Sequence, residues 1–136
     1  YLSESVLQWE LPEGVQKLKS PFDIKKVIMP IVDSARLGAL KHHSTATNTM
    51  ERLMFLYETG VYSRKWYQEV TDLYSFLMRK RFQHQAMLLS KNIPPNNEIE
   101  PEECSEFELL LLKKGVMQIE ALKGMISLGS KGINIR

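Results

Sequence analysis

The stretch from Ser63 to Met78 constrains the fold most, because its apolar residues recur at steps of three and four. Those residues are Trp66, Val70, Leu73, Tyr74 and Leu77. Such spacing places the side chains on one face of a helix with about 3.6 residues per turn. The sequence therefore predicts an amphipathic helix with Ser63 as its N-cap. We expect this helix to organise the core, with Trp66 and Leu73 sealed inside.

A second helix is predicted near the start of the chain. Ser20, Pro21 and Asp23 are typical of an N-cap, a first helical residue and an acidic residue in the first turn. The apolar spacing continues through Pro30, which favours one kinked helix. Two shorter helices that meet at Met29 are the alternative.

A third helix should follow the polar segment 41–48, which is typical of a loop. Asn48 and Glu51 resemble a capping pair, and Gly60 is suited to a left-handed residue at the helix end. Only two residues separate Gly60 from Ser63, so the central helix is expected to fold back antiparallel on this one.

The central helix is expected to end at Arg79, Lys80 and Arg81, because cations favour the negative end of a helix dipole. A short fourth helix is then predicted over 82–91. Residues 92–104 contain three prolines and no helical spacing, which indicates a long connection without regular structure.

The last helix should begin after Ser105, which forms a capping box with Glu108, and its apolar residues continue to Ile126. No strand alternation is evident. The predicted fold class is therefore all-α: a single antiparallel bundle of about five helices with an N-terminal arm packed across it. The expected divisions are an arm over 1–19, the bundle over 20–128 and a frayed tail over 129–136.

Composition limits the classes of function and location. A chain of 136 residues with 43% apolar and 25% charged residues is typical of one soluble domain. Its net charge of +2 is too small to indicate a nucleic-acid or membrane partner.

The single cysteine, Cys104, excludes an internal disulfide and favours a cytoplasmic or nuclear location. No apolar run is long enough for a membrane span. Because the chain lacks an initial Met, we expect it to be part of a larger protein.

Three runs of the sequence share a pattern of apolar, proline and arginine positions at Val27, Pro30, Ile31, Arg52, Leu53, Leu56 and Phe82. In this pattern the chain resembles the small helical domain shared by the steroid receptor RNA activator protein and the C-terminus of the COPII outer-coat subunit. The resemblance covers roughly residues 24–89, and the chain departs from the pattern around His84 and in the last helix, which lacks a tryptophan. It implies a five-helix bundle without a catalytic site, used as an interaction module.

The residues predict no catalytic, metal-binding or cofactor-binding site. His42, His43 and His84 lack the spacing of metal ligands and are interpreted as surface histidines. Neighbouring glutamates should raise the pKa of the Cys104 thiol, which argues against a reactive thiolate. No glycine-rich phosphate motif is present. We therefore expect a protein that is not an enzyme and needs no cofactor.

Two features could bind a partner. Arg79, Lys80 and Arg81 could form a basic patch, although solvation of a helix end explains them as well. An excess of apolar residues is the second feature: Trp9 and Leu11 in the arm, and Leu110 and Leu111 in the last helix. One interpretation is that these apolar residues form a surface site for a partner. The other is that the arm covers the last helix within the same chain.

The sequence thus favours a non-enzymatic scaffold or adaptor module that docks a helix or peptide of another protein on an apolar face. The alternative is an RNA- or DNA-binding domain that uses the basic residues at 79–81. The oligomeric state is left open.

Overall fold

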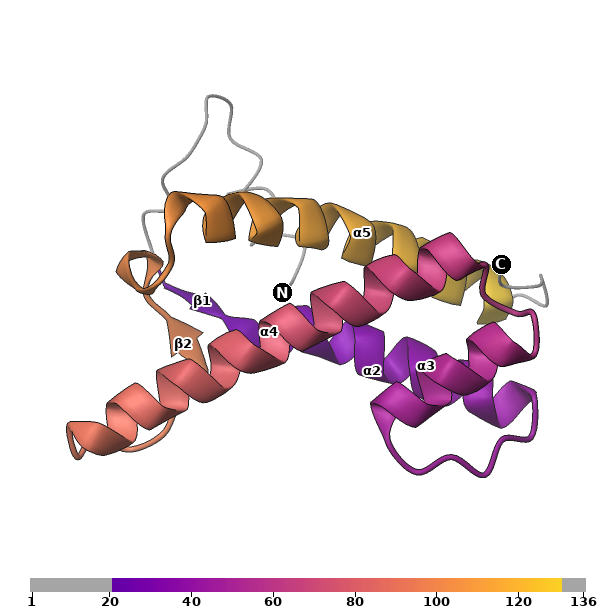
Figure 1. Ribbon diagram of the computed structural model, residues 1–136, viewed down its shortest axis with the longest axis horizontal. Helices are drawn as coiled ribbons and strands as arrows, with labels where there is room; N and C mark the ends of the chain where they lie inside the picture. Colours follow the sequence, from indigo (N-terminus) through magenta and orange to yellow (C-terminus); the bar gives the residue numbers. More distant parts are fainter. Residues whose placement is uncertain (1–20, 131–136) are drawn as a thin grey trace.

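The computed structural model describes residues 21–130, with side chains described through residue 121, and shows four helices and one small sheet in this part of the chain (Figure 1). The helices are α2 (Ile24–Lys41), α3 (Thr49–Glu58), α4 (Arg64–Ser90) and α5 (Glu106–Ser130). Two short strands, β1 (Phe22–Asp23) and β2 (Glu98–Ile99), and the 3-10 turn η2 (Pro101–Glu103) complete it. The all-α prediction is correct in outline, but the count of five helices is wrong.

Helix α2 lies at the centre of the fold and packs against α3, α4 and α5. Its buried apolar residues are Ile24, Val27, Ile28, Ile31, Ala35 and Ala39. By contrast, Trp66 and Leu73 on α4 are only partly buried, although both pack against the core. The expectation that Trp66 and Leu73 are sealed inside is therefore wrong. Helix α4 nevertheless packs against α2 and α3, and Leu73 approaches Gly115 of α5.

The start of α2 is set by Asp23, whose carboxylate accepts a hydrogen bond from the Lys25 amide at 2.9 Å. Helix α2 therefore begins later than Pro21, and Ser20 lies outside the described residues. The helix continues through Pro30 without interruption, so one helix is formed here and the alternative of two shorter helices is wrong.

The predicted start of α3 and the turn that follows it are confirmed. Asn48 Oδ1 accepts from the Glu51 amide at 2.9 Å, which caps α3. Gly60 adopts a left-handed φ of 83°, a conformation that glycine adopts without steric cost. Ser63 Oγ then accepts from the Trp66 amide at 3.1 Å and starts α4, which runs back past α3 (Figure 1).

Helix α4 is one continuous helix of 27 residues, where the sequence predicted two helices. The apolar period stops near Arg79 because the next buried positions on the inner face are the polar residues Lys80 and His84. Leu88 then returns the face to apolar character. The merger of the two predicted helices accounts for the lower helix count.

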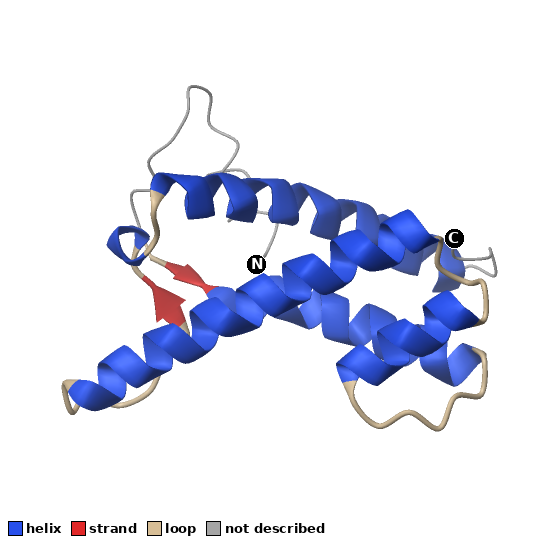
Figure 2. Cartoon of the chain, in the orientation of Figure 1, coloured by secondary structure: helices blue, strands red, loops and turns tan. Residues whose placement is uncertain are grey.

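The connection 92–104 has more regular structure than predicted. β2 pairs antiparallel with β1 (Figure 2), and in the register of this pair Phe22 is the partner of Ile99. Both side chains are buried in the core, and the Ile24 amide donates to the Asn97 carbonyl at 2.9 Å. The connection is therefore joined to the beginning of the chain.

Helix α5 starts with the predicted capping box. The Glu108 amide donates to Ser105 Oγ at 3.1 Å, and the Ser105 amide donates to Glu108 Oε1 at 3.0 Å. A Cβ on Gly115 would overlap Leu73, so α5 and α4 approach closely there. The helix extends to Ser130, two residues into the predicted tail, while the arm at 1–19 and residues 131–136 lie outside the described residues.

No helix in the described range 21–130 is both long enough and apolar enough to cross a membrane.

Candidate functional site

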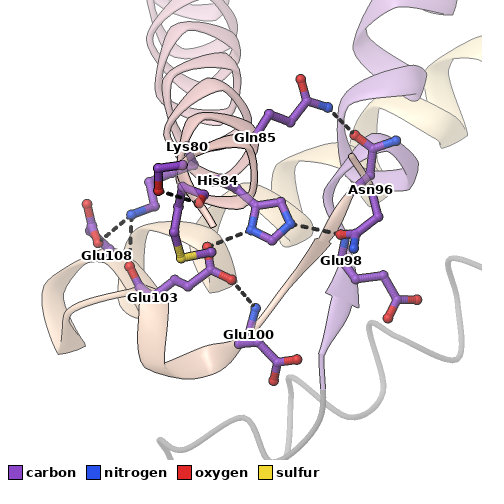
Figure 3. Close-up of polar contacts among 11 residues, drawn as sticks. Lys80, His84, Gln85, Asn96, Glu98, Glu100, Glu103 and Glu108 are labelled. Carbon is purple, nitrogen blue, oxygen red and sulfur yellow. Dashed lines mark hydrogen bonds and ion pairs between the residues drawn. The ribbon is translucent and has the colours of Figure 1, made fainter. Parts of the chain in front are cut away.

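A group of polar side chains lies where the inner face of α4 meets the segment that connects it to α5 (Figure 3). We call Lys80, His84, Asn96, Glu103 and Glu108 the polar cluster. Lys80 and His84 are one helical turn apart and only 7% and 3% exposed. Two buried ionisable side chains of this kind need partners, because burial of an unpaired charge or polar group is costly.

Both ring nitrogens of His84 have partners. Nδ1 lies 2.7 Å from Glu103 Oε1, and Nε2 lies 2.9 Å from Asn96 Oδ1. Asn96 Oδ1 also accepts from the Glu98 amide at 2.9 Å, which identifies this atom as an oxygen and makes Nε2 a donor. One further proton must then lie between Nδ1 and Oε1, supplied by either the imidazole or the carboxyl group.

Lys80 connects α4 to η2 and to the first turn of α5. Its Nζ donates to the Glu103 carbonyl at 3.0 Å and to Glu108 Oε1 at 3.1 Å. Burial alone would raise the pKa of Glu108, but the Ser105 amide and the Lys80 ammonium outweigh it and lower the pKa. The carboxylate form of Glu108 is therefore favoured in the folded protein.

A neighbouring contact extends the cluster toward α2. Arg81 Nε and Gln85 Nε2 both donate to Asn97 Oδ1, at 3.0 Å and 3.1 Å. The carbonyl of Asn97 in turn accepts from the Ile24 amide. Polar side chains of α4 thus hold the connecting segment against the start of α2.

Cys104 lies beside the polar cluster and is partly buried. Burial is the main cause that raises the pKa of its thiol to about 11, with smaller contributions from Glu108 and Glu103 against an opposing one from Lys80. The predicted rise in the pKa of the Cys104 thiol is confirmed, but burial rather than nearby negative charge is the principal cause. The thiol is protonated at neutral pH and is a poor nucleophile.

The polar cluster joins elements of the fold, because each of its ionisable groups is bonded to another part of the chain. Within the described residues, no group of three or more His, Cys, Asp or Glu side chains is placed to hold a metal ion. The geometry thus fits a role in positioning the connecting segment.

The residues predicted as a basic patch lie on different sides of α4. Arg79 is exposed, with its guanidinium carbon 5.7 Å from the centroid of the Phe76 ring. Lys80 is buried in the polar cluster, and Arg81 is bonded to Asn97. Placement of these residues at a helix end was wrong, since α4 continues to Ser90. They do not form one cationic surface.

The apolar residues predicted to bind a partner differ in their exposure to solvent. Leu110 is 63% exposed, whereas Leu111 is partly buried and packs against the core. Trp9 and Leu11 lie outside the described residues.

The sequence reasoning missed the polar cluster. His84 was interpreted as a surface residue and is buried, while His42 and His43 are exposed as predicted. The available signal was the four-residue spacing of Lys80, His84 and Leu88, which continues the inner face of α4 with polar members.

Comparison with known proteins identifies a family. The family described as "Putative nucleotidyltransferase substrate binding domain" matches residues 12–129. No curated protein and no solved structure matches the chain. The match overturns the resemblance to the steroid receptor RNA activator and COPII domain, which depended on short apolar runs that many helical bundles share. It also overturns the scaffold or adaptor function, because it indicates a role associated with a nucleotidyltransferase. The chain therefore belongs to the family described as "Putative nucleotidyltransferase substrate binding domain".

Proposed function

We propose that this chain is the substrate-binding domain of a nucleotidyltransferase and that a separate catalytic unit carries out the transfer. The family match over residues 12–129 carries the proposal, since it spans β1, β2 and all but the last residue of α5. The proposed partner is therefore the catalytic unit, and the ligand is one of the substrates of nucleotidyl transfer.

The chemistry of the described side chains supports a non-catalytic role. A general base must reach a substrate proton, but both nitrogens of His84 are bonded within the fold. A nucleophilic cysteine needs an accessible thiolate, but the pKa of Cys104 is raised to about 11. These residue types would be the usual candidates for catalysis, and here their environments favour structural roles.

Nucleoside triphosphates are the first probes of the proposal, because every nucleotidyltransferase consumes a nucleotide. The 136-residue chain would be titrated separately with ATP, GTP, CTP and UTP in the presence of Mg²⁺ while amide chemical shifts are recorded. We expect at least one nucleotide to shift a contiguous set of amides saturably. Failure of all four to bind would show that the nucleotide is not the substrate held by this domain.

A parallel assay tests the non-catalytic half of the proposal. Pyrophosphate release from the nucleotide that binds should stay at the level of the buffer control when the chain is the only protein present, with water, or glycerol added as an alcohol, as the acceptor of the nucleotidyl group. Pyrophosphate release that rises with the concentration of the chain would contradict the proposal. Titration with the corresponding nucleoside and with inorganic triphosphate would separate recognition of the base from recognition of the phosphates.

A further inference from the structure

Helix α5 has an apolar outer face that no described residue covers. Phe107, Leu110 and Met117 are 68%, 63% and 56% exposed, and their spacing places them on one side of the helix. We call these three residues the outer stripe. The core residues of α5 are Leu112, Val116 and Ile119, which face the opposite direction. Three large apolar side chains aligned on one face are typical of a surface that another segment covers.

We propose that the N-terminal segment, residues 1–20, docks on the outer stripe through Leu7, Trp9 and Leu11. These residues bring a large aromatic and two aliphatic side chains within five positions of the sequence. Apolar burial is the main source of free energy for such a contact, and Trp contributes the largest area.

The described part of the chain begins near the start of α5. Residue 21 leads directly into β1, which pairs with β2, and β2 is followed by η2 and then α5. Residues 12–20 can extend to roughly 30 Å when the backbone is extended. The outer stripe spans only about 15 Å from Phe107 to Met117 at the rise of an α-helix. The segment can therefore reach the whole stripe.

Opposite charges are present at one place along the two surfaces, although Lys17 and Lys19 lie later in the N-terminal segment and Glu106 is exposed beside Phe107. Residues 1–14 contain Glu4, Glu10 and Glu13 and no lysine or arginine. Lys114 is exposed on α5 between Leu110 and Met117. Opposite charges across such a contact favour the correct register of docking.

The size of the outer stripe favours an intrachain occupant over a second copy of the chain. A stable interface between free proteins buries about 800 Å² on each partner, which is more than three partly exposed side chains provide. A tethered segment is present at an effective concentration in the millimolar range, so a small contact is enough to hold it. The proposal does not depend on which substrate the domain binds.

Tryptophan fluorescence of the full chain tests the proposal. Trp66→Phe leaves Trp9 as the only tryptophan, and acrylamide quenching then reports whether its indole is covered. We expect Trp9 to be shielded in this variant. Addition of Leu110→Asp should shift its emission to longer wavelength and raise its quenching constant toward that of N-acetyltryptophanamide.

The matched control is Leu89→Asp in the same variant, because Leu89 is 72% exposed but lies on α4. It should leave the quenching of Trp9 unchanged. A Trp9 that is fully quenched before either substitution would overturn the proposal. So would a shielded Trp9 that responds to Leu89→Asp or does not respond to Leu110→Asp.

Hydrogen exchange provides a second test that leaves Trp66 in place. Amides of residues 6–11 should be protected in the unmodified chain and should lose that protection with Leu110→Asp. Protection should persist with Leu89→Asp. Unprotected amides in the unmodified chain, or protection that survives Leu110→Asp, would contradict docking on the outer stripe.

Discussion

The Nδ1 atom of His84 lies 2.7 Å from Oε1 of Glu103, and this contact joins the C-terminal part of α4 to the turn before α5. The other carboxylate oxygen of Glu103 accepts from the Glu100 amide at 2.8 Å, so the side chain is held from two sides. His84 is 3% exposed and the Glu103 side chain is 17% exposed, which limits the water available to replace either partner.

Replacement of His84 by alanine should therefore lower the free energy of unfolding substantially. The variant loses both hydrogen bonds of the imidazole and leaves a cavity. It also leaves the largely buried Glu103 carboxyl without its contact to His84, so the expected cost is about 2–4 kcal/mol. Urea denaturation at neutral pH measures this cost. His42→Ala is the control, because His42 is exposed and should change stability little. Equal losses in the two variants would contradict the structural role of His84.

The lowered pKa of Glu108 predicts an acid-dependent contribution to stability. A carboxyl group whose pKa is lower in the folded state stabilises the fold above its unfolded pKa, and this contribution is lost as pH falls through the folded value. Glu108→Gln should thus be less stable than the unmodified chain at about pH 6, and the difference should shrink toward about pH 3. Urea denaturation across this range measures the effect, which should be modest because Glu108 is 30% exposed.

Glu106→Gln is the matched control for this pH series. Glu106 lies in the same first turn of α5 but is exposed. Its replacement should give a smaller difference in stability than Glu108→Gln at the higher pH. If the two variants follow the same pH dependence, the contacts of Glu108 with Lys80 and Ser105 do not contribute as the geometry indicates.

Gly115→Ala should change stability little, because two opposing effects meet at this position. Alanine favours a helix interior over glycine by about 1 kcal/mol. Its Cβ, however, would overlap the terminal methyl of Leu73 on α4 and force that side chain to move, at a cost near the lower end of about 1–3 kcal/mol for overpacking. Combination with Leu73→Ala should remove the overlap. A double-mutant cycle measured by urea denaturation should therefore show coupling, with the Gly115 substitution more favourable in the Leu73→Ala background. Additive effects would show that α4 and α5 separate freely at this point.

The buried hydrogen bond between Tyr62 and Ser34 allows a further test. Their hydroxyl oxygens are 3.0 Å apart in the core. Tyr62→Phe removes one partner and leaves the Ser34 hydroxyl buried, which should cost about 1–2 kcal/mol of unfolding free energy. Tyr57→Phe is the control, because the Tyr57 ring keeps its stacking on Tyr67 after loss of the hydroxyl. A double variant with Ser34→Ala should recover part of the loss, since neither polar partner then remains.

Local signals in the sequence were sufficient to locate several boundaries of the fold. The side chains of Asn48, Ser63 and Ser105 cap helices as predicted, and Gly60 has the left-handed conformation expected of it. These features depend on residues within a few positions of one another. They can therefore be recognised without knowledge of the tertiary structure.

Long-range pairing explains what the sequence did not reveal. Lys80 and His84 are buried only because Glu103, Glu108 and Asn96 come back to meet them, so the apolar period of α4 stops although the helix continues. A strand of two residues such as β2 is likewise too short to show an alternating pattern. The family could not be inferred from apolar spacing, since such spacing specifies helical packing rather than a ligand.

The pairing of β1 with β2 also determines how far the domain can be shortened. Because one strand precedes the first described helix and the other follows the third, the structural unit closes only after the chain has passed through α2, α3 and α4. A fragment truncated after Lys91 would retain three complete helices but would lose Ile99, which lies against Phe22. We therefore expect such a fragment to expose Phe22 and to be less stable than the whole domain, so dissection of the protein should keep both strands in one piece.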